Sequence, residues 1–309
     1  MKFSNAIVYR VLDTIPLASL AEFEQALEAN QFTHCGATEV LSIGFVPPRG
    51  VKHGALVEAI DGHRFLRVMV ETKSVPSAIV TERLDERVAQ IESETGRKPG
   101  NKYRKELKEE IYLSLLPQAF PRRRAINMWL DTKALTLAVD STTQTRADDA
   151  VTHLVAAVPN LALSLIDTTV APQSAMAQWL LQEPPEAFTL ERDLRLEAQD
   201  EIGGTVRYSK QALDPQEVAS HIMKGKAPTA LSMTWDDRVS FTLDDSLKLR
   251  GIKLLETALA DKAGAEDDQF DADAALFSGE MSLLLSDLFE ALGGQAQMTI
   301  SANSEVGAA

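Results

Sequence analysis

The sequence predicts an α+β fold, and two observations lead to this prediction. Two segments in the middle of the 309-residue chain, 77–96 and 101–115, carry apolar residues at steps of three and four, which is typical of helices. Segments on either side of them, such as 64–71 and 128–139, have the apolar patterns of strands. Hydrophobic residues make up 45% of the chain, enough for a sizeable core in one large or two ordinary domains.

Residues 1–75 are expected to form a small N-terminal α+β unit. A strand is predicted at 7–12, and a helix at 17–29 whose apolar residues share one face. A second strand is predicted at 64–71, where alternation indicates at least one buried face. Together these elements make the first part of the core.

A loop-rich segment at 34–54 separates the helix from that second strand. Within it, the stretch from Gly44 to Gly50 holds two adjacent prolines, Pro47 and Pro48, between glycines. Such a composition opposes regular structure and predicts a rigid surface turn.

Residues 76–125 are expected to form a basic helical insert. The first helix has a narrow apolar stripe and ends near Gly96, after which Pro99 and Gly100 turn the chain. The second helix places its apolar residues on one face at steps of four, so Lys105 and Lys108 point away from that face. The helix therefore presents a basic outer surface.

The stretch 97–124 holds nine Lys or Arg residues and three Glu in a chain whose net charge is −14. The distribution of charge decides where a polyanion can dock, so this stretch predicts a phosphate-binding surface. The alternative is a set of ordinary helix-surface ion pairs, such as Lys102 with Glu106. The triplet at 122–124 favours the phosphate-binding reading, since its three arginines look uncompensated and need a partner.

Phe120 lies between Pro117 and Pro121, which hold it stiffly in place. From these residues alone it is either a plug of the core or an exposed anchor for another surface, and the core plug is favoured.

Residues 126–200 are expected to continue the α+β core, and 201–295 to form a second α+β part with acidic C-terminal helices. In this second part the segments 235–243 and 247–253 predict a hairpin. Its second strand directs Lys248 and Arg250 to one side. These two residues form either a second, weaker basic strip or only the solvated face of a sheet.

The C-terminal region is acidic, with ten Asp or Glu residues and one lysine between Glu256 and Glu290. Asp271, Asp273 and Glu280 could be the magnesium ligands of a nuclease, although acids beside a leucine-rich helix are more often a solvated face. The paired glycines at 293–294 end that helix, and the tail at 296–309 is expected to be disordered.

Motif searches exclude several classes of enzyme. The sequence has no phosphate loop, no nucleophile elbow and no zinc-protease helix, and its five histidines are scattered. We therefore expect no catalytic site, no cofactor and no metal. The single cysteine, Cys35, fits a reducing cytoplasm, and no second Cys or His pair stands near it at ligand spacing. The start lacks the apolar region of a secretion signal, and the longest apolar region, 154–166, is too short to span a bilayer.

Several runs along the chain resemble the bacterial recombination-associated RdgC family. The order and spacing of these runs agree over nearly the whole length. They are Gly44-Phe45-Val46-Pro47-Pro48, Leu115-Leu116-Pro117-Gln118-Ala119-Phe120, Met128-Trp129-Leu130-Asp131-Thr132, Phe270-Asp271-Ala272-Asp273, Phe277-Ser278-Gly279-Glu280 and Ala291-Leu292-Gly293-Gly294.

The resemblance implies a curved α+β monomer that closes into a ring-shaped homodimer around duplex DNA. It also implies binding without strong sequence preference, possible contact with single strands, antagonism of the RecA recombinase and a cytoplasmic, nucleoid-associated location. In such proteins the segment like 116–120 lies near a contact that closes the ring, which makes Phe120 a dimer anchor. Segments like 207–211 line the hole.

These expectations together give one set of candidate DNA-binding residues. The Arg triplet is denser in charge than the family pattern leads us to expect. The candidates are Arg97, Lys98, Lys102, Arg104, Lys105, Lys108, Arg122, Arg123, Arg124, Lys210, Gln211, Lys248 and Arg250.

Two other functions compete with a non-catalytic DNA-binding ring. One is a metal-dependent nuclease that uses Asp271, Asp273 and Glu280. The other is an acidic inhibitor that binds RecA directly, without DNA.

Overall fold

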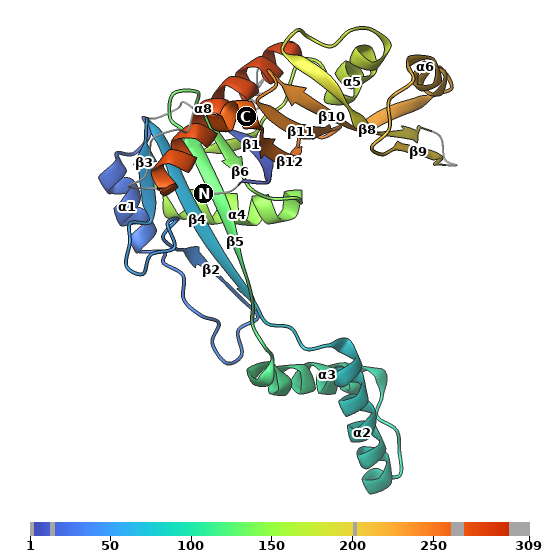
Figure 1. The fold of residues 1–309 in the computed structure, drawn as a ribbon. Helices are drawn as coiled ribbons and strands as arrows, with labels where there is room; N and C mark the ends of the chain where they lie inside the picture. Colours follow the sequence, from blue (N-terminus) through green and yellow to red (C-terminus); the bar gives the residue numbers. More distant parts are fainter. Residues whose placement is uncertain (1–2, 13–15, 200–202, 261–268, 297–309) are drawn as a thin grey trace, which may run out of the picture.

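The computed structural model describes residues 3–12, 16–199, 203–260 and 269–296 (Figure 1). The expected tail at 296–309 lies outside the described residues except for Ala296. The fold mixes helices with one large antiparallel sheet, which confirms the α+β prediction. No helix in the described ranges is both long enough and apolar enough to cross a membrane.

The sheet has twelve strands among the described residues, in the order β2-β4-β5-β6-β1-β12-β11-β10-β8-β9, with β3 beside β4 and β7 beside β1. All named strand pairs are antiparallel. The strands are β1 (Asn5–Val11), β2 (Leu41–Phe45), β3 (Val57–Ile60), β4 (His63–Thr72), β5 (Arg122–Asp131), β6 (Thr136–Val139), β7 (Leu163–Leu165), β8 (Phe188–Ala198), β9 (Thr205–Tyr208), β10 (Lys226–Trp235), β11 (Val239–Asp244) and β12 (Leu249–Leu254).

Strand β1 joins the two halves of this sheet. One of its edges pairs with β6, where Ile7 lies opposite Val139. Its other edge is divided, since Asn5 and Ala6 pair with β12 and the C-terminal end of β1 pairs with β7. The first strand of the chain, β1, therefore pairs directly with the last one, β12.

Two hydrophobic cores lie on opposite faces of the first half of the sheet, because successive strand side chains point to opposite sides. Along β1, Ile7 and Tyr9 enter the core under α1 (Leu20–Glu28) and α4 (Gln144–Ala157). Ala6 and Val8 enter the other core, to which α8 (Gln269–Ala291) contributes its apolar side chains. Figure 1 shows α8 crossing this face of the sheet.

Aromatic contacts fix α8 on the first half. The ring of Phe277 stacks on Phe3 at 4.6 Å between centroids and meets Trp129 edge-on at 5.6 Å. Ser282 donates a hydrogen bond of 2.7 Å to the buried Asp131. The C-terminal helix thus completes the core of the N-terminal strands, which ties the two ends of the chain together.

The second half of the sheet is covered on one face by helices. These are α5 (Pro172–Leu181), α6 (Pro215–Met223) and part of α8, with the short α7 (Glu256–Ala260) between β12 and α8. Asp214 caps α6 by accepting a hydrogen bond of 2.8 Å from the backbone N–H of Gln216.

A pair of helices branches off between β4 and β5. These helices are α2 (Ser77–Thr95) and α3 (Asn101–Leu115), followed by a 3₁₀ turn, η1 (Leu116–Gln118). We call residues 77–118 the helical arm. Its small core consists of Leu84, Val88 and Leu107, with Ile91 and Ile111 packed against them, as the helical periodicity predicts.

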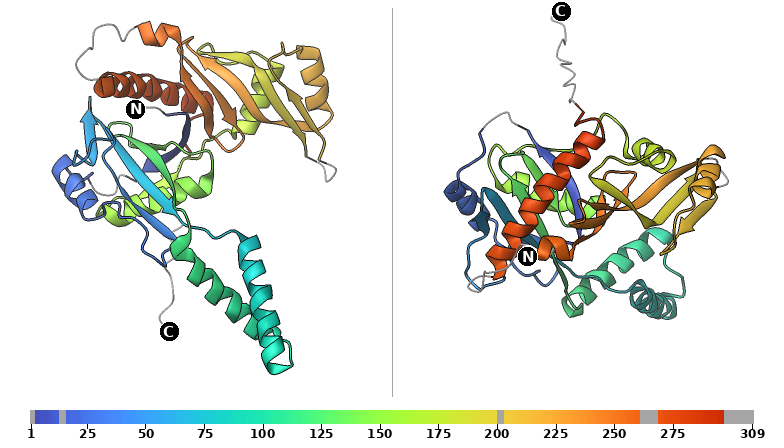
Figure 2. Two further views of the ribbon diagram at one scale, coloured as in Figure 1. Left: turned by 60° about the horizontal axis from the view of Figure 1, so that its bottom comes forward. Right: turned by 45° about the horizontal axis from the view of Figure 1, so that its top comes forward.

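The molecule has the outline of a crescent in Figures 1 and 2. The helical arm extends from one end of the body. The other end carries β8, β9 and α6, which we call the second arm, and both arms extend toward the same side. This outline agrees with the curved monomer that the family resemblance implies.

Several sequence-based boundaries were wrong. The segment 34–54 contains strand β2, so Gly44 and Phe45 belong to the sheet rather than to a surface turn, and Phe45 is buried. Only the part after Val46 turns, where Gly50 donates a backbone hydrogen bond to Pro47. Trp235 ends β10, so the predicted hairpin consists of β11 and β12 and begins at Val239.

Candidate nucleic-acid interface

The basic helix α3 exposes three of its candidate lysines, Lys102, Lys105 and Lys108. Two other candidates reach across to α2. Arg104 lies 3.6 Å from Asp85, and Lys98 lies 3.8 Å from Glu92. All four of these side chains are at least two-fifths exposed, so the ion pairs are weak and leave both cations accessible to a ligand.

The partner helix α2 reduces the positive charge of the helical arm. Residues 76–125 hold eleven Lys or Arg residues and eight Asp or Glu residues, five of the acids on α2. The excess of positive charge over this insert is therefore smaller than the stretch 97–124 suggests alone. Over the helical arm itself, residues 77–118, eight Lys or Arg residues are balanced by eight Asp or Glu residues.

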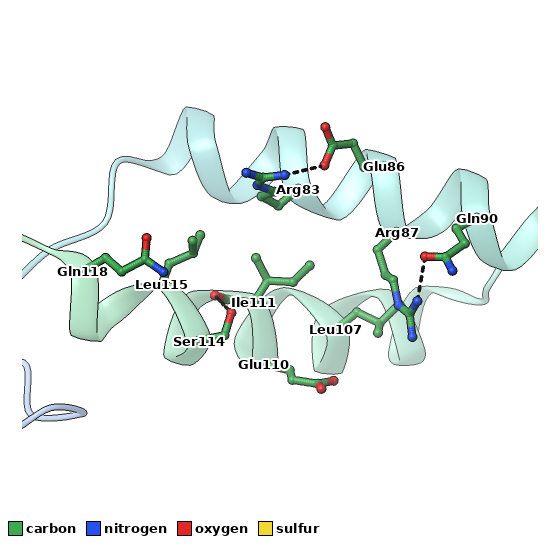
Figure 3. A pocket seen from close by; sticks show the side chains of 10 residues that line it. All are labelled: Arg83, Glu86, Arg87, Gln90, Leu107, Glu110, Ile111, Ser114, Leu115 and Gln118. Atoms are coloured by element: carbon green, nitrogen blue, oxygen red, sulfur yellow. Dashed lines mark hydrogen bonds and ion pairs between the residues drawn. The ribbon is translucent and has the colours of Figure 1, made fainter.

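A groove of about 420 Å³ runs between the two helices of the arm (Figure 3). Arg83 donates to Glu86 at 3.0 Å, and Arg87 donates to Gln90 at 2.7 Å, all on α2. Both arginines are thus engaged along their own helix, and Ile111 of α3 points between the two helices.

The Arg triplet lies in strand β5 and its members differ. Arg122 is exposed, and Arg123 Nε donates to Glu71 Oε2 of β4 at 2.5 Å. Arg124 points to the face of the sheet opposite to that of Arg123. There, burial and the neighbouring Arg146 lower the pKa of the Arg124 guanidinium. The interpretation of the triplet as uncompensated was therefore wrong for Arg123, because its partner comes from a strand fifty residues earlier.

Glu71 is a buried carboxylate with three partners and is only 1% exposed. Besides Arg123, it accepts a hydrogen bond of 2.8 Å from the Cys35 backbone N–H and lies 3.0 Å from His34 Nδ1. The Arg123 hydrogen bond is the main reason that the pKa of Glu71 falls to about 2. His34 and Cys35 thus surround a carboxylate that already binds a guanidinium.

The open face of β8–β12 carries Arg195, which the sequence reasoning missed, and Arg207, which lies in the expected hole-lining segment 207–211 but was not selected as a candidate. Apolar side chains such as Leu194 and Leu196 point into the core under the helices. The intervening residue, Arg195, points to the other face and lies directly opposite Arg207 of β9. The alternation of apolar and charged residues along 194–196 and 206–208 was the available signal.

This open face continues across the second half of the sheet in one row. Ser232 pairs with Thr242, and Thr242 pairs with the candidate residue Arg250. Arg250 binds the carboxylate of Asp244 with two nitrogens at 2.7 and 3.0 Å, while Lys248 is half-buried in the turn before β12. The row is polar throughout, which agrees with a solvated sheet face.

Lys210 and Gln211 lie in the exposed loop between β9 and α6. Lys210 has a positive φ of 55°, which is uncommon for a residue with a side chain. Asp193 of β8 stabilises this turn, since its Oδ1 accepts hydrogen bonds from Ser209 Oγ at 3.0 Å and from the Lys210 N–H at 3.2 Å. Both candidates therefore belong to the second arm.

Phe120 is 91% exposed, so the interpretation as a core plug was wrong. It lies at the base of the helical arm and is one of the residues that line a groove of about 630 Å³. Apolar side chains of this groove include Val75, Ile79 and Leu115. An exposed phenylalanine beside an apolar groove is typical of a protein-binding surface.

Two of the C-terminal candidate carboxylates, Asp271 and Glu280, have arginine partners. Asp271 lies 2.5 Å from Arg49, and Glu280 is buried and binds Arg238 at 2.5 and 2.8 Å. Both carboxylates are thus bound to arginines rather than grouped as magnesium ligands. Within the described part of the chain there is no group of three or more His, Cys, Asp or Glu residues that could hold a metal ion.

Comparison with known proteins identifies the family. A family model described as "Putative exonuclease, RdgC" matches residues 1–295. The chain belongs to the RdgC family. This confirms the resemblance drawn from the sequence.

RdgC relatives match over almost their full length. The protein of Dechloromonas aromatica is 37% identical, covering 96% of this chain and 98% of the relative. The proteins of Cupriavidus necator and Herminiimonas arsenicoxydans are each 36% identical, covering 96% of this chain and 99% of each relative. All three are named "Recombination-associated protein RdgC".

Proposed function

We propose that this RdgC-family protein binds DNA, chiefly duplex DNA and without strong sequence preference, as a ring-shaped homodimer. The observation that supports this best is the position of the cations. Exposed lysines of α3 lie on one arm of the crescent, and Arg195, Arg207 and Lys210 lie on the other. Cations on both arms of a curved molecule suit a long polyanion held between them.

Ring closure is proposed to involve Phe120. Its exposed ring is part of a groove that also has the apolar side chains Val75, Ile79 and Leu115, so both occur on the same surface of the protomer. Two copies related by a two-fold axis could therefore each offer a phenylalanine and a groove to the other. The two protomers would then enclose the space on the open side of each crescent.

Restraint of recombination follows from this proposal. A ring on duplex DNA occupies the backbone that the RecA recombinase needs, so it would limit RecA without contacting it. We propose a nucleoid-associated location for the same reason. Direct binding to RecA in the absence of DNA would instead support the acidic-inhibitor alternative.

The acidic character of the whole chain is compatible with DNA binding. A net charge of −14 opposes non-specific adhesion, whereas local cations decide where phosphate is bound. A surface that contacts phosphate rather than base edges positions a duplex without reading its sequence. This accounts for the proposed lack of sequence preference.

The test is duplex binding as a function of salt, with and without magnesium. We expect the affinity to fall by about one power of salt concentration per phosphate contacted, and the DNA to remain intact with magnesium. The triple variant Lys102→Gln, Lys105→Gln, Lys108→Gln should bind more weakly and with a smaller salt dependence.

The control variant Lys52→Glu, Lys133→Gln changes the charge by the same amount at exposed positions away from the arm, and it should bind as the unaltered protein does. Binding that does not depend on salt, or no binding, would contradict the proposal. Magnesium-dependent shortening of linear DNA would support the exonuclease named in the family description instead.

A further inference from the structure

A pocket of about 340 Å³ opens on the open face of the sheet, where the second arm meets β10 and β11. Strands β8, β9, β10 and β11 all contribute to it. The polar side chains around it are Asp193, Arg195, Arg207, Ser232 and Thr242. The residues that line it are spread over fifty positions of the sequence, from Asp193 to Thr242.

Two arginines form one wall of this pocket. Arg195 and Arg207 are directly opposite each other on neighbouring antiparallel strands, and like charges in this position destabilise a sheet. Arg195 has an ion pair with Glu197 on its own strand. Arg207 has no ion-pair partner among the residues that the structure describes. An anion between the two guanidinium groups would relieve their repulsion.

The floor of the pocket offers a hydrogen-bond donor. Ser232 and Thr242 share one hydrogen bond of 2.7 Å between their hydroxyl oxygens. Two hydroxyl groups carry two protons, and their mutual bond uses only one. The second proton is available to an acceptor that enters the pocket, such as a phosphate oxygen.

One edge of the pocket is ordered by Asp193. Its carboxylate holds the turn that carries Lys210, as described above, so a third cation follows Arg207 by three residues in an exposed turn. Asp193 and Glu197 also place negative charge near the site. Because these two carboxylates offset part of the positive charge, the site favours a singly charged anion over a multiply charged one.

We propose that this pocket binds one phosphodiester group of the DNA backbone. Arg195 and Arg207 contact the phosphate oxygens, and the hydroxyl pair donates to the same group. Asp193 acts as a positioning residue for Lys210. This inference rests on the proposed DNA binding and assigns its main phosphate contact on the second arm.

The first experiment measures the salt dependence of duplex binding for the variant Arg195→Gln, Arg207→Gln. Losing the contact of one phosphate with two arginines should lower the slope of log affinity against log salt by about one and weaken binding at least tenfold. The control variant Lys52→Gln, Lys133→Gln removes the same charge from exposed positions of the first half and should keep the slope. Circular dichroism and mass in solution check that both variants are folded.

A second variant tests the pocket by a gain of binding. Asp193→Asn keeps an oxygen that can accept from Ser209 and Lys210 but removes a negative charge, so affinity should rise about fivefold. Misfolding cannot produce such a gain.

The outcomes separate this inference from the function on which it rests. If the unaltered protein shows no salt-dependent binding, the proposed function fails and the pocket assignment fails with it. If the unaltered protein binds but the arginine variant keeps its slope, or Asp193→Asn weakens binding, the pocket assignment alone is wrong.

Discussion

Glu71 connects three segments of the chain at the base of the helical arm. Its carboxylate receives Arg123 from β5, the Cys35 N–H from the loop before β2 and the ring of His34. The carboxylate itself is buried, whereas the side chains of Arg123 and His34 are more than half exposed. A buried charge must be paired, so Arg123 is held in place by the fold before any ligand arrives.

The substitution Glu71→Gln should lower the melting temperature at pH 7, because it leaves Arg123 without its charged partner. The folded-state pKa of about 2 lies below the ordinary value of 4.5, so the carboxylate stabilises the fold above pH 4.5. That stabilisation is lost as pH falls from 4.5 toward 2. Thermal unfolding measured across this range should show a flatter pH dependence in the variant.

The exposed Glu82→Gln variant on α2 is the control and should behave as the unaltered protein does. An unchanged melting temperature of Glu71→Gln at pH 7 would show that the buried ion pair does not stabilise the fold.

The helical arm is an element with a core of its own. Leu84, Val88 and Leu107 form a cluster that is separate from the two cores of the sheet. Since only two connections join the arm to β4 and β5, its stability depends on these few contacts. Local unfolding of the arm should therefore need less free energy than unfolding of the body.

Leu107→Ala should destabilise the arm by about 2 to 3 kcal/mol, because Leu107 is only 4% exposed and the small core cannot easily refill the cavity. Hydrogen exchange should accelerate at amides of 77–115 and stay unchanged in β10. Leu113→Ala, on the exposed side of the same helix, should cost less than about 0.5 kcal/mol. Equal acceleration in β10 would mean that the arm and body unfold together.

At the scale of the whole molecule, the crescent outline results from how the two halves of the sheet meet at β1. Helices cover both faces of the first half but only one face of β8–β12. The open face of the second half and the helical arm are thus left to contact something outside the protomer. Phe120 stands apart from both cores, at the base of the arm.

Phe120→Ser should leave the protomer folded, because the side chain is almost fully exposed, and should weaken the proposed dimer about tenfold or more. Analytical ultracentrifugation over a range of protein concentrations would measure this change. Leu41→Ser replaces another exposed apolar residue on strand β2 and should leave dimerisation unaltered. A Phe120→Ser protein that dimerises like the unaltered one would exclude Phe120 from ring closure.

The sequence by itself determined the α+β class, the helix pair and the family. The helices could be predicted because their apolar residues recur at short spacings in the sequence, as Leu107 and Ile111 do one turn apart. The basic character of 97–124 and the isolation of Phe120 between prolines were equally local. These features depend on neighbours in the chain.

Only the tertiary structure decided which charges are available. Arg123 is neutralised by Glu71 and Arg250 by Asp244, and α2 places five acids beside the basic helix. Conversely, Arg195 and Arg207 become a pair only when β8 and β9 align. Coulomb interactions depend on distance in space, and strand pairing sets those distances between residues that the sequence keeps apart.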